Sequence, residues 1–174
     1  MIRKASMDDI PAILNIIADA KSLLKSKHSL QWQDADGYPN FNTFQQDVDK
    51  GSLYVVDNNP IVAVCSLGRH GEPTYNQIYD GKWLNDDPFY VIHRLAVKKE
   101  AYGKGFGKTL MQKMEMICLA EGIFNIRCDT THENEPMNHL LLSLGYQDCG
   151  IIYLDRPSMA DRLRKAYHKI LVKK

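Results

Sequence analysis

The feature that most constrains the fold is a glycine-rich turn between a strand and an amphipathic helix. The run "FYVIHRLAV", residues 89–97, is apolar and rich in β-branched and aromatic side chains, as expected of a strand. The turn "AYGKGFGKTL", residues 101–110, leads into a helical face that includes Leu110, Met114 and Cys118. Such a unit points several backbone N–H groups at one place in front of a helix N-terminus, which suits an anion such as pyrophosphate.

Two well-known phosphate motifs are excluded by spacing. A Walker A loop ending in "GKT" needs a glycine five positions before Gly107, where Tyr102 stands. A dinucleotide-binding fingerprint that begins at Gly103 needs a glycine where the chain has Lys108. Two interpretations remain open from spacing alone: an anion-binding turn, with Lys104 and Lys108 reaching phosphate oxygens, or a tight connection without a ligand.

The rest of the pattern alternates strands and helices in one domain, 1–174, of the α/β or α+β class with a mixed sheet. The expected strands are 2–5, 52–56, 60–68, 123–130 and 146–154, and the expected helices are 6–24, 41–51 and 134–145. Residues 69–88 form a long connection in which Tyr75 and Tyr79 suggest a short helix; long connections are often functional, and an aromatic-anchored flap is the alternative. Periodicity leaves 161–171 ambiguous between strand and helix.

Composition excludes several classes of protein. A formal net charge of +1 gives no field for nucleic acid or a membrane surface, and the basic residues near the C-terminus, Arg164 among them, predict a solvated face. The cysteines, four in all, form no C-x-x-C pair, so neither a zinc site nor a disulfide framework is expected, and we expect no metal. The N-terminus lacks a signal-type apolar core and no apolar run is long enough for a membrane span, which predicts a cytoplasmic protein.

The segment "LAVKKEAYGKGFGKTLM" resembles the acetyl-CoA signature of the GNAT superfamily of N-acetyltransferases. Gly105 and Gly107 match the glycine positions of that signature, whereas Tyr102 stands where the family usually has Arg or Gln. Downstream, "ENEPMNHLLLSLGY" resembles a later block of the family, with Asn134 and the pair Gly145 and Tyr146 in place.

The resemblance implies a GNAT-like α/β (α+β) fold. The expected sheet is mixed and strongly twisted, with six or seven strands and about four helices, and it splays between its fourth and fifth strands so that acetyl-CoA enters the gap. Residues 164–171 would then be the seventh strand. The residues expected to bind the coenzyme are Leu95, Ala96, Val97, Tyr102, Gly103, Lys104, Gly105, Phe106, Gly107, Lys108, Thr109 and Asn134.

The resemblance also implies transfer of acetyl from acetyl-CoA to a primary amine of a small molecule or peptide. His93, two residues before Leu95, is the candidate base, because an alkylamine with a pKa near ~10 is mostly protonated at pH 7. The tyrosine that many members carry seven residues after the asparagine is replaced by Leu141, so the usual proton donor is absent. Candidate substitute donors are His132, Tyr90 and Tyr153, for each of which a structural role is the alternative. Direct release of the thiolate, or a proton supplied by water, is equally compatible with the sequence.

The amine is expected to enter between residues 31–40 and the 69–88 connection. The aromatic side chains expected to shape an apolar floor are Trp32, Tyr75, Tyr79 and Trp83. Asp34 and Asp36 would attract a cationic amine or simply solvate a loop. A non-catalytic acyl-CoA-binding module is the alternative function, a nucleotide-binding protein is a weaker one, and a homodimer is compatible with the resemblance.

Overall fold

The computed structural model describes residues 1–69, 71–159 and 161–172. The strands are β1 (Ile2–Lys4), β2 (Leu53–Asp57), β3 (Ile61–Gly68), β4 (Tyr90–Val97), β5 (Asn125–Thr130), β6 (Gln147–Tyr153) and β7 (Leu163–Ile170). The α-helices of this described part are α1 (Ile10–Ser26), α2 (Phe41–Asp49), α3 (Phe106–Ala120) and α4 (Glu135–Ser143). Short 3₁₀ turns occur at η1 (Met7–Asp9), η2 (Pro73–Asn76) and η3 (Lys99–Ala101).

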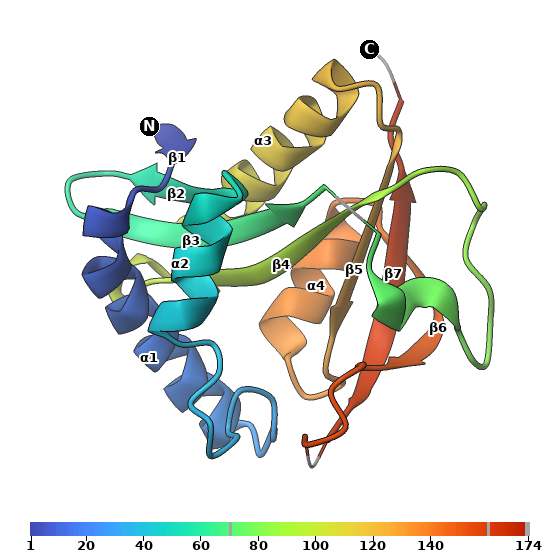
Figure 1. Ribbon diagram of the computed structural model, residues 1–174, viewed down its shortest axis with the longest axis horizontal. Coiled ribbons are helices and arrows are strands. Elements are labelled where there is room, and N and C mark those ends of the chain that lie inside the picture. Colours follow the sequence, from blue (N-terminus) through green and yellow to red (C-terminus); the bar gives the residue numbers. More distant parts are fainter. Residues whose placement is uncertain (70, 160, 173–174) are drawn as a thin grey trace.

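The strands form one seven-stranded sheet in the order β1-β2-β3-β4-β5-β7-β6 (Figure 1). Every neighbouring pair is antiparallel except β4 and β5, which run parallel and share only two register pairs, Tyr90 with Ile126 and Val91 with Arg127. Beyond Val91 the two strands diverge. The expected mixed sheet with a splay between its fourth and fifth strands is therefore confirmed, and so is the strand at the C-terminal end.

Helices cover both faces of the sheet, with α1 and α2 on one face and α3 and α4 on the other (Figure 1). The spacing of Ile10, Ile13 and Ile17 explains the first helix, because these side chains fall on one face and are completely buried against β2 and β3. Under α3 and α4, a larger cluster includes Met111 and Met114. All four cysteines are buried and none forms a disulfide.

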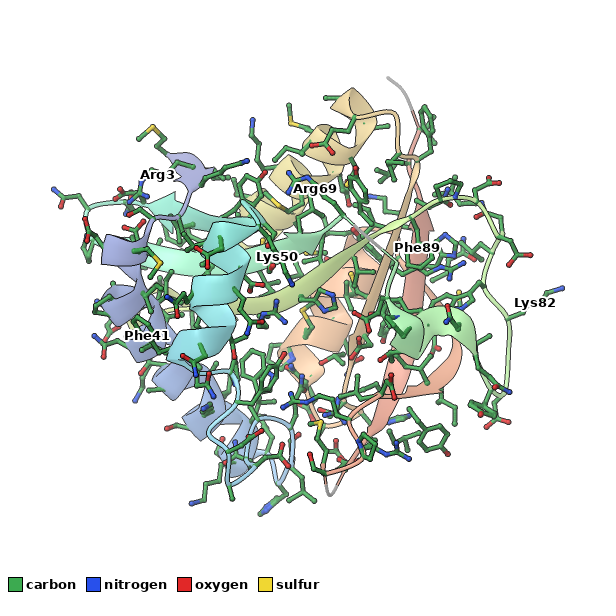
Figure 2. The ribbon with its side chains drawn as sticks, in the orientation of Figure 1. Arg3, Phe41, Lys50, Arg69, Lys82 and Phe89 are labelled. Atoms are coloured by element: carbon green, nitrogen blue, oxygen red, sulfur yellow. The ribbon has the colours of Figure 1, made fainter. Side chains whose placement is uncertain are left out.

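The 69–88 connection differs from the sequence-based expectation. The helix expected around Tyr75 and Tyr79 was wrong in extent: the only turn there among the described residues is η2, after which Tyr79 forms an isolated bridge with Ile151 of β6. Tyr75 packs with Val91 and Ala166 in a small third cluster on the β4–β7 part of the sheet. At the outer bend of this connection, Lys82 points away from the molecule (Figure 2).

Candidate active site

A β-bulge in β4 lies where β4 and β5 have diverged. Cys65 of β3 lies opposite two residues of β4, Arg94 and Leu95, because the register shifts there. Arg94 has a φ of +54°, a left-handed conformation that is uncommon for a residue with a side chain. The extra residue reverses the alternation of side chains, so Ala96 packs under α1 whereas Leu95 and Val97 pack on the α3 side.

A buried ion pair holds the bulge. The Arg94 guanidinium donates to both carboxylate oxygens of Asp47 on α2, at 2.7 and 3.0 Å, and to the Tyr38 hydroxyl at 3.0 Å. The Arg94 and Asp47 side chains are 15% and 7% exposed. Burial by itself lowers the pKa of Arg94, but Tyr38 and Asp47 outweigh it and leave the pKa raised. The guanidinium therefore stays charged and ties α2 to β4.

The glycine turn leaves a set of backbone donors without a main-chain partner. Gly103 and Gly105 have φ of +74° and +81°, which glycine adopts without strain, and a Cβ at either would meet nothing within 4 Å. The first bond of α3 runs from the Thr109 amide to the Gly105 carbonyl, so within the described chain the amides of 105–108 donate to no carbonyl. With the helix N-terminus behind them, these N–H groups suit a phosphate group, and the turn fits the diphosphate of coenzyme A.

One large cavity of about 1220 Å³ joins this turn to the cleft between β4 and β5. The residues of the expected set that line it are His93, Leu95, Ala96, Val97, Tyr102, Gly103, Gly105, Phe106, Gly107, Asn134 and Trp32. Lys104, Lys108 and Thr109 do not line it: the two lysines are exposed at the turn, and the Thr109 hydroxyl donates to the Gly105 carbonyl at 3.0 Å. Lys50 and Arg69 line the same cavity on the side of α2 and β3 (Figure 2).

The splay leaves one edge of β4 open within this cavity. Past Val91, β4 has no ladder partner on the β5 side among the described residues. Backbone groups of 95–97 that are not directed at β3 are therefore open on that side, and an extended ligand can pair with them as an added strand. Asn134 caps α4 at the opposite wall, accepting from the Met137 amide at 3.3 Å.

His93 faces the α1 and α2 side of the sheet, close to the bulge. Its Nε2 lies 3.5 Å from Glu72 Oε2, and a Cβ at Gly68 would come within 3.4 Å of the imidazole ring. Burial, with a smaller contribution from the Arg94 charge, lowers the pKa of His93 to about 3. The imidazole is therefore neutral at pH 7.

Of the aromatic residues expected to form a substrate floor, only Trp32 lines the cavity. Tyr75 is 2% exposed and belongs to the third cluster, Trp83 donates from Nε1 to the Tyr75 carbonyl at 3.1 Å, and Tyr79 packs edge-on against Tyr153. The 69–88 connection thus uses these three side chains to dock on the sheet.

The substitute proton donors also lie outside the cavity lining. The Tyr90 hydroxyl donates to Glu121 at 2.7 Å and its pKa is raised, mainly by burial, to about 12. His132 is exposed, and Tyr153 is 46% exposed on β6. Leu141 is completely buried in the core under α4.

The charged residues of the acceptor side differ from the sequence-based expectation, and Asp129 was not among the candidates. Asp36 lines the cavity but is paired with Arg156 at 3.1 Å, so it does not carry a free negative charge, and Asp34 is not in the lining. Asp129 and Arg164 line the cavity from β5 and β7. Arg164 is 1% exposed, so the expected solvated basic face was wrong at this position, and Lys173 and Lys174 of that segment lie outside the described residues.

Contacts between the two halves of the chain lie just beyond the end of β5. The hydroxyl groups of Ser29, after α1, and Thr131, after β5, lie 3.1 Å apart and are buried, and Thr131 also donates to Gln31 Oε1 at 3.1 Å. Nearby, Lys27 Nζ lies 3.4 Å from Glu135 Oε2. These contacts join the segment after α1 to the residues between β5 and the start of α4.

Comparisons with known proteins assign the family. The model of the acetyltransferase (GNAT) family matches residues 17–146, well over half of the chain. The chain belongs to the GNAT acetyltransferase family. A GNAT family acetyltransferase from Streptococcus agalactiae 2603 is 33% identical, with a TM-score of 0.89 over 99% of this chain and 96% of that one.

More distant GNAT structures share the fold. A GNAT family acetyltransferase from Listeria monocytogenes 4b F2365 is 20% identical, with a TM-score of 0.72 over 98% of this chain and 94% of that one. A ribosomal-protein-alanine N-acetyltransferase from Brucella melitensis is 19% identical, with a TM-score of 0.68 over 98% and 99% of the two chains. No protein of curated function matches the sequence.

Two features are absent from the described residues. No helix in 1–69, 71–159 and 161–172 has the length and apolar character needed to cross a membrane. The same residues contain no group of three or more His, Cys, Asp or Glu side chains that could hold a metal ion.

Proposed function

We propose that this GNAT protein transfers an acetyl group from acetyl-CoA to a primary amine of a small molecule or peptide, by direct attack within a ternary complex. The observation that carries the proposal is the continuity of one cavity from the free amides of the glycine turn, along the open edge of β4, to His93. A turn that only connected a strand to a helix would need no such continuity.

Different segments of the chain would bind different parts of the coenzyme. The amides of 105–108 would hold the diphosphate, and the main chain of Leu95, Ala96 and Val97 would hold the pantetheine arm in the splay. Acetyl-CoA supplies a thioester whose carbonyl carbon is open to attack. The backbone N–H of Leu95 or a neighbour would donate to the carbonyl oxygen, on which negative charge develops.

His93 would act on the reacting nitrogen, but its low basicity limits which proton it can accept. Moving a proton from an alkylammonium with a pKa near ~10 to a base with a pKa of about 3 is unfavourable by on the order of 10 kcal/mol. A nitrogen that has already formed its bond to the acyl carbon is far more acidic, so a weak neutral base such as His93 suits a proton released after attack.

The first test is binding. With acetyl-CoA at about a hundred times its Kd, the native state gains roughly 2.7 kcal/mol, equivalent to a rise in Tm of about 5–10 °C for a chain of this length. Coenzyme A should raise Tm as acetyl-CoA does, whereas ATP and NAD should not. Equal rises with ATP would favour the nucleotide-binding alternative, and no rise with any ligand in folded protein would overturn the proposal.

The second test is turnover. Release of coenzyme A thiol is measured with a panel of primary amines that includes small alkylamines, amino acids and peptides with free N-termini. Acetylation of at least one amine is expected, with product confirmed by mass. Binding of acetyl-CoA without thiol release across the panel would favour the non-catalytic acyl-CoA-binding module, for which the buried Leu141 at the usual donor position is the motivating observation.

A further inference from the structure

One segment of the 69–88 connection contacts both strands of the splay. Glu72, the N-cap of η2, lies 3.5 Å from His93 of β4, and the Tyr75 hydroxyl within η2 donates to Asp129 of β5 at 2.6 Å. Figure 1 shows η2 lying in front of the β5–β7 part of the sheet. Glu72, His93 and Asp129 all line the cavity.

The register of the sheet explains why these side chains meet. The last pair between β4 and β5 joins Val91 to Arg127, and paired residues of parallel strands point to the same face. Two residues further along each strand stand His93 and Asp129. Both side chains lie on the same face of the sheet as those of Val91 and Arg127. The gap between β4 and β5 separates them, and η2 lies over that face.

We propose that the Asp129 carboxylate, oriented by the Tyr75 hydroxyl, binds the ammonium group of the acceptor and takes its first proton. The inference rests on the proposed function. Asp129 is the one carboxylate in this cluster that lies on the β5 side of the opening, across from His93. Asp129 is thus a second acid–base group, and it lies on β5, where the sequence alone indicated no catalytic candidate.

The charges around Asp129 come from three elements. Burial raises the pKa of Asp129, the hydrogen bond from Tyr75 and the Arg164 guanidinium on β7 lower it, and Glu72 beside η2 raises it. The net direction is upward, so Asp129 is a stronger base than an ordinary aspartate and, unlike His93, is not disfavoured by a depressed pKa. Burial raises the pKa of Tyr75 well above its usual value, so Tyr75 remains the donor.

The proton balance uses both groups. An acceptor ammonium carries three protons and the amide product keeps one. The first proton goes to Asp129; the nitrogen then forms its bond to the acetyl carbon while the carbon–sulfur bond breaks. The second proton passes through His93 to the departing sulfur, which leaves as the thiol, and Asp129 returns its proton to solvent.

The experiment compares the pH dependence of kcat/KM for wild type, Asp129→Asn, Tyr75→Phe and the control Asp86→Asn, with the Kd for acetyl-CoA measured for each. Asp86 is an exposed aspartate of the same connection. Asp129→Asn should lower kcat/KM at least about 100-fold with the Kd changed less than about threefold, since the isosteric amide cannot accept the proton. Asp86→Asn should match wild type.

Tyr75→Phe tests the role of Asp129 through a shift in the pH profile, which the loss of a purely structural contact would not produce. Loss of the hydrogen bond removes a group that lowers the pKa of Asp129, so the acid limb of the profile should shift to higher pH, with kcat/KM recovered above it. This variant also decides the matter if Asp129→Asn does not fold.

The outcomes separate the two proposals. Active wild type with an unshifted acid limb in Tyr75→Phe, or with Asp129→Asn within about threefold of wild type, overturns the role of Asp129 and leaves acetyl transfer standing. Wild type that binds acetyl-CoA but acetylates no amine overturns acetyl transfer, and the role of Asp129 with it.

Discussion

The Arg94–Asp47 pair allows a prediction that can be worked from the structure. Arg94 holds the left-handed conformation that creates the bulge in β4, a conformation that costs on the order of 1–3 kcal/mol and persists only where surrounding contacts enforce it. The contacts are three charged hydrogen bonds to Asp47 and one to Tyr38. Asp47→Asn removes the charge that compensates a guanidinium that is 15% exposed.

Breaking a buried ion pair from one side typically costs about 3–5 kcal/mol. Because asparagine keeps one oxygen as an acceptor and Tyr38 still accepts from Arg94, we expect the lower end, about 3 kcal/mol. For a chain of this length that corresponds to a fall in Tm of about 6–12 °C.

The assay is urea unfolding at pH 7, followed by circular dichroism, for wild type, Asp47→Asn and the control Asp49→Asn. Asp49 is exposed in the last turn of the same helix, so its variant should lie within about 0.5 kcal/mol of wild type. If Asp47→Asn loses less than about 1 kcal/mol, or no more than the control, the bulge does not depend on this pair and the reasoning is wrong.

Three further predictions concern stability. Gly105→Ala, at a φ of +81°, should lose about 1–2 kcal/mol in urea unfolding and weaken acetyl-CoA binding, whereas Gly71→Ala, which lacks a positive φ, should change the stability little. The hydrogen bond from Arg3 lowers the pKa of Asp9 to about 2, so its contribution is present above pH 4 and is lost as the pH falls through about 2. Asp9→Asn should therefore cost about 1 kcal/mol at pH 7, allowing for solvent screening, and about half of that at pH 3; an equal cost at both would contradict the assignment. Burial lowers the pKa of His168 to about 4, so the unfolded state binds more protons than the native state between pH 6.5 and 4. The free energy of unfolding of the wild type should therefore fall by about 2 kcal/mol from pH 7 to pH 4.5. In His168→Gln the fall over the same range should be much smaller.

The sequence predicted those parts of the fold that depend on local pattern. The helix expected at 6–24, the strands expected at 52–56 and 60–68, and the strand before the glycine turn were all confirmed. The segment that became β7 could not be assigned from periodicity, because the polar residues Arg164 and His168 occupy buried positions in it. Only the family resemblance identified it as a strand.

The polar residues of the acceptor side could not be predicted in the same way. No local pattern identifies Asp47 as the partner of Arg94, because 46 residues lie between them in the sequence. Their pairing depends on how α2 packs on β4. Asp129 looks like an ordinary polar residue at the end of a strand, and Tyr75 looks like a substrate-facing aromatic. Their 2.6 Å hydrogen bond appears only when the 69–88 connection docks across the splay.

The Ser29–Thr131 contact has a consequence for the walls of the cavity. Register pairs join β4 to β5 at one end of the gap, and the Ser29–Thr131 contact joins the segment after α1 to the segment after β5. Gln31, which accepts from Thr131, lines the cavity, and so does Asn134 at the start of α4. Cavity walls that come from the two halves of the chain are therefore held together by buried hydrogen bonds as well as by the sheet.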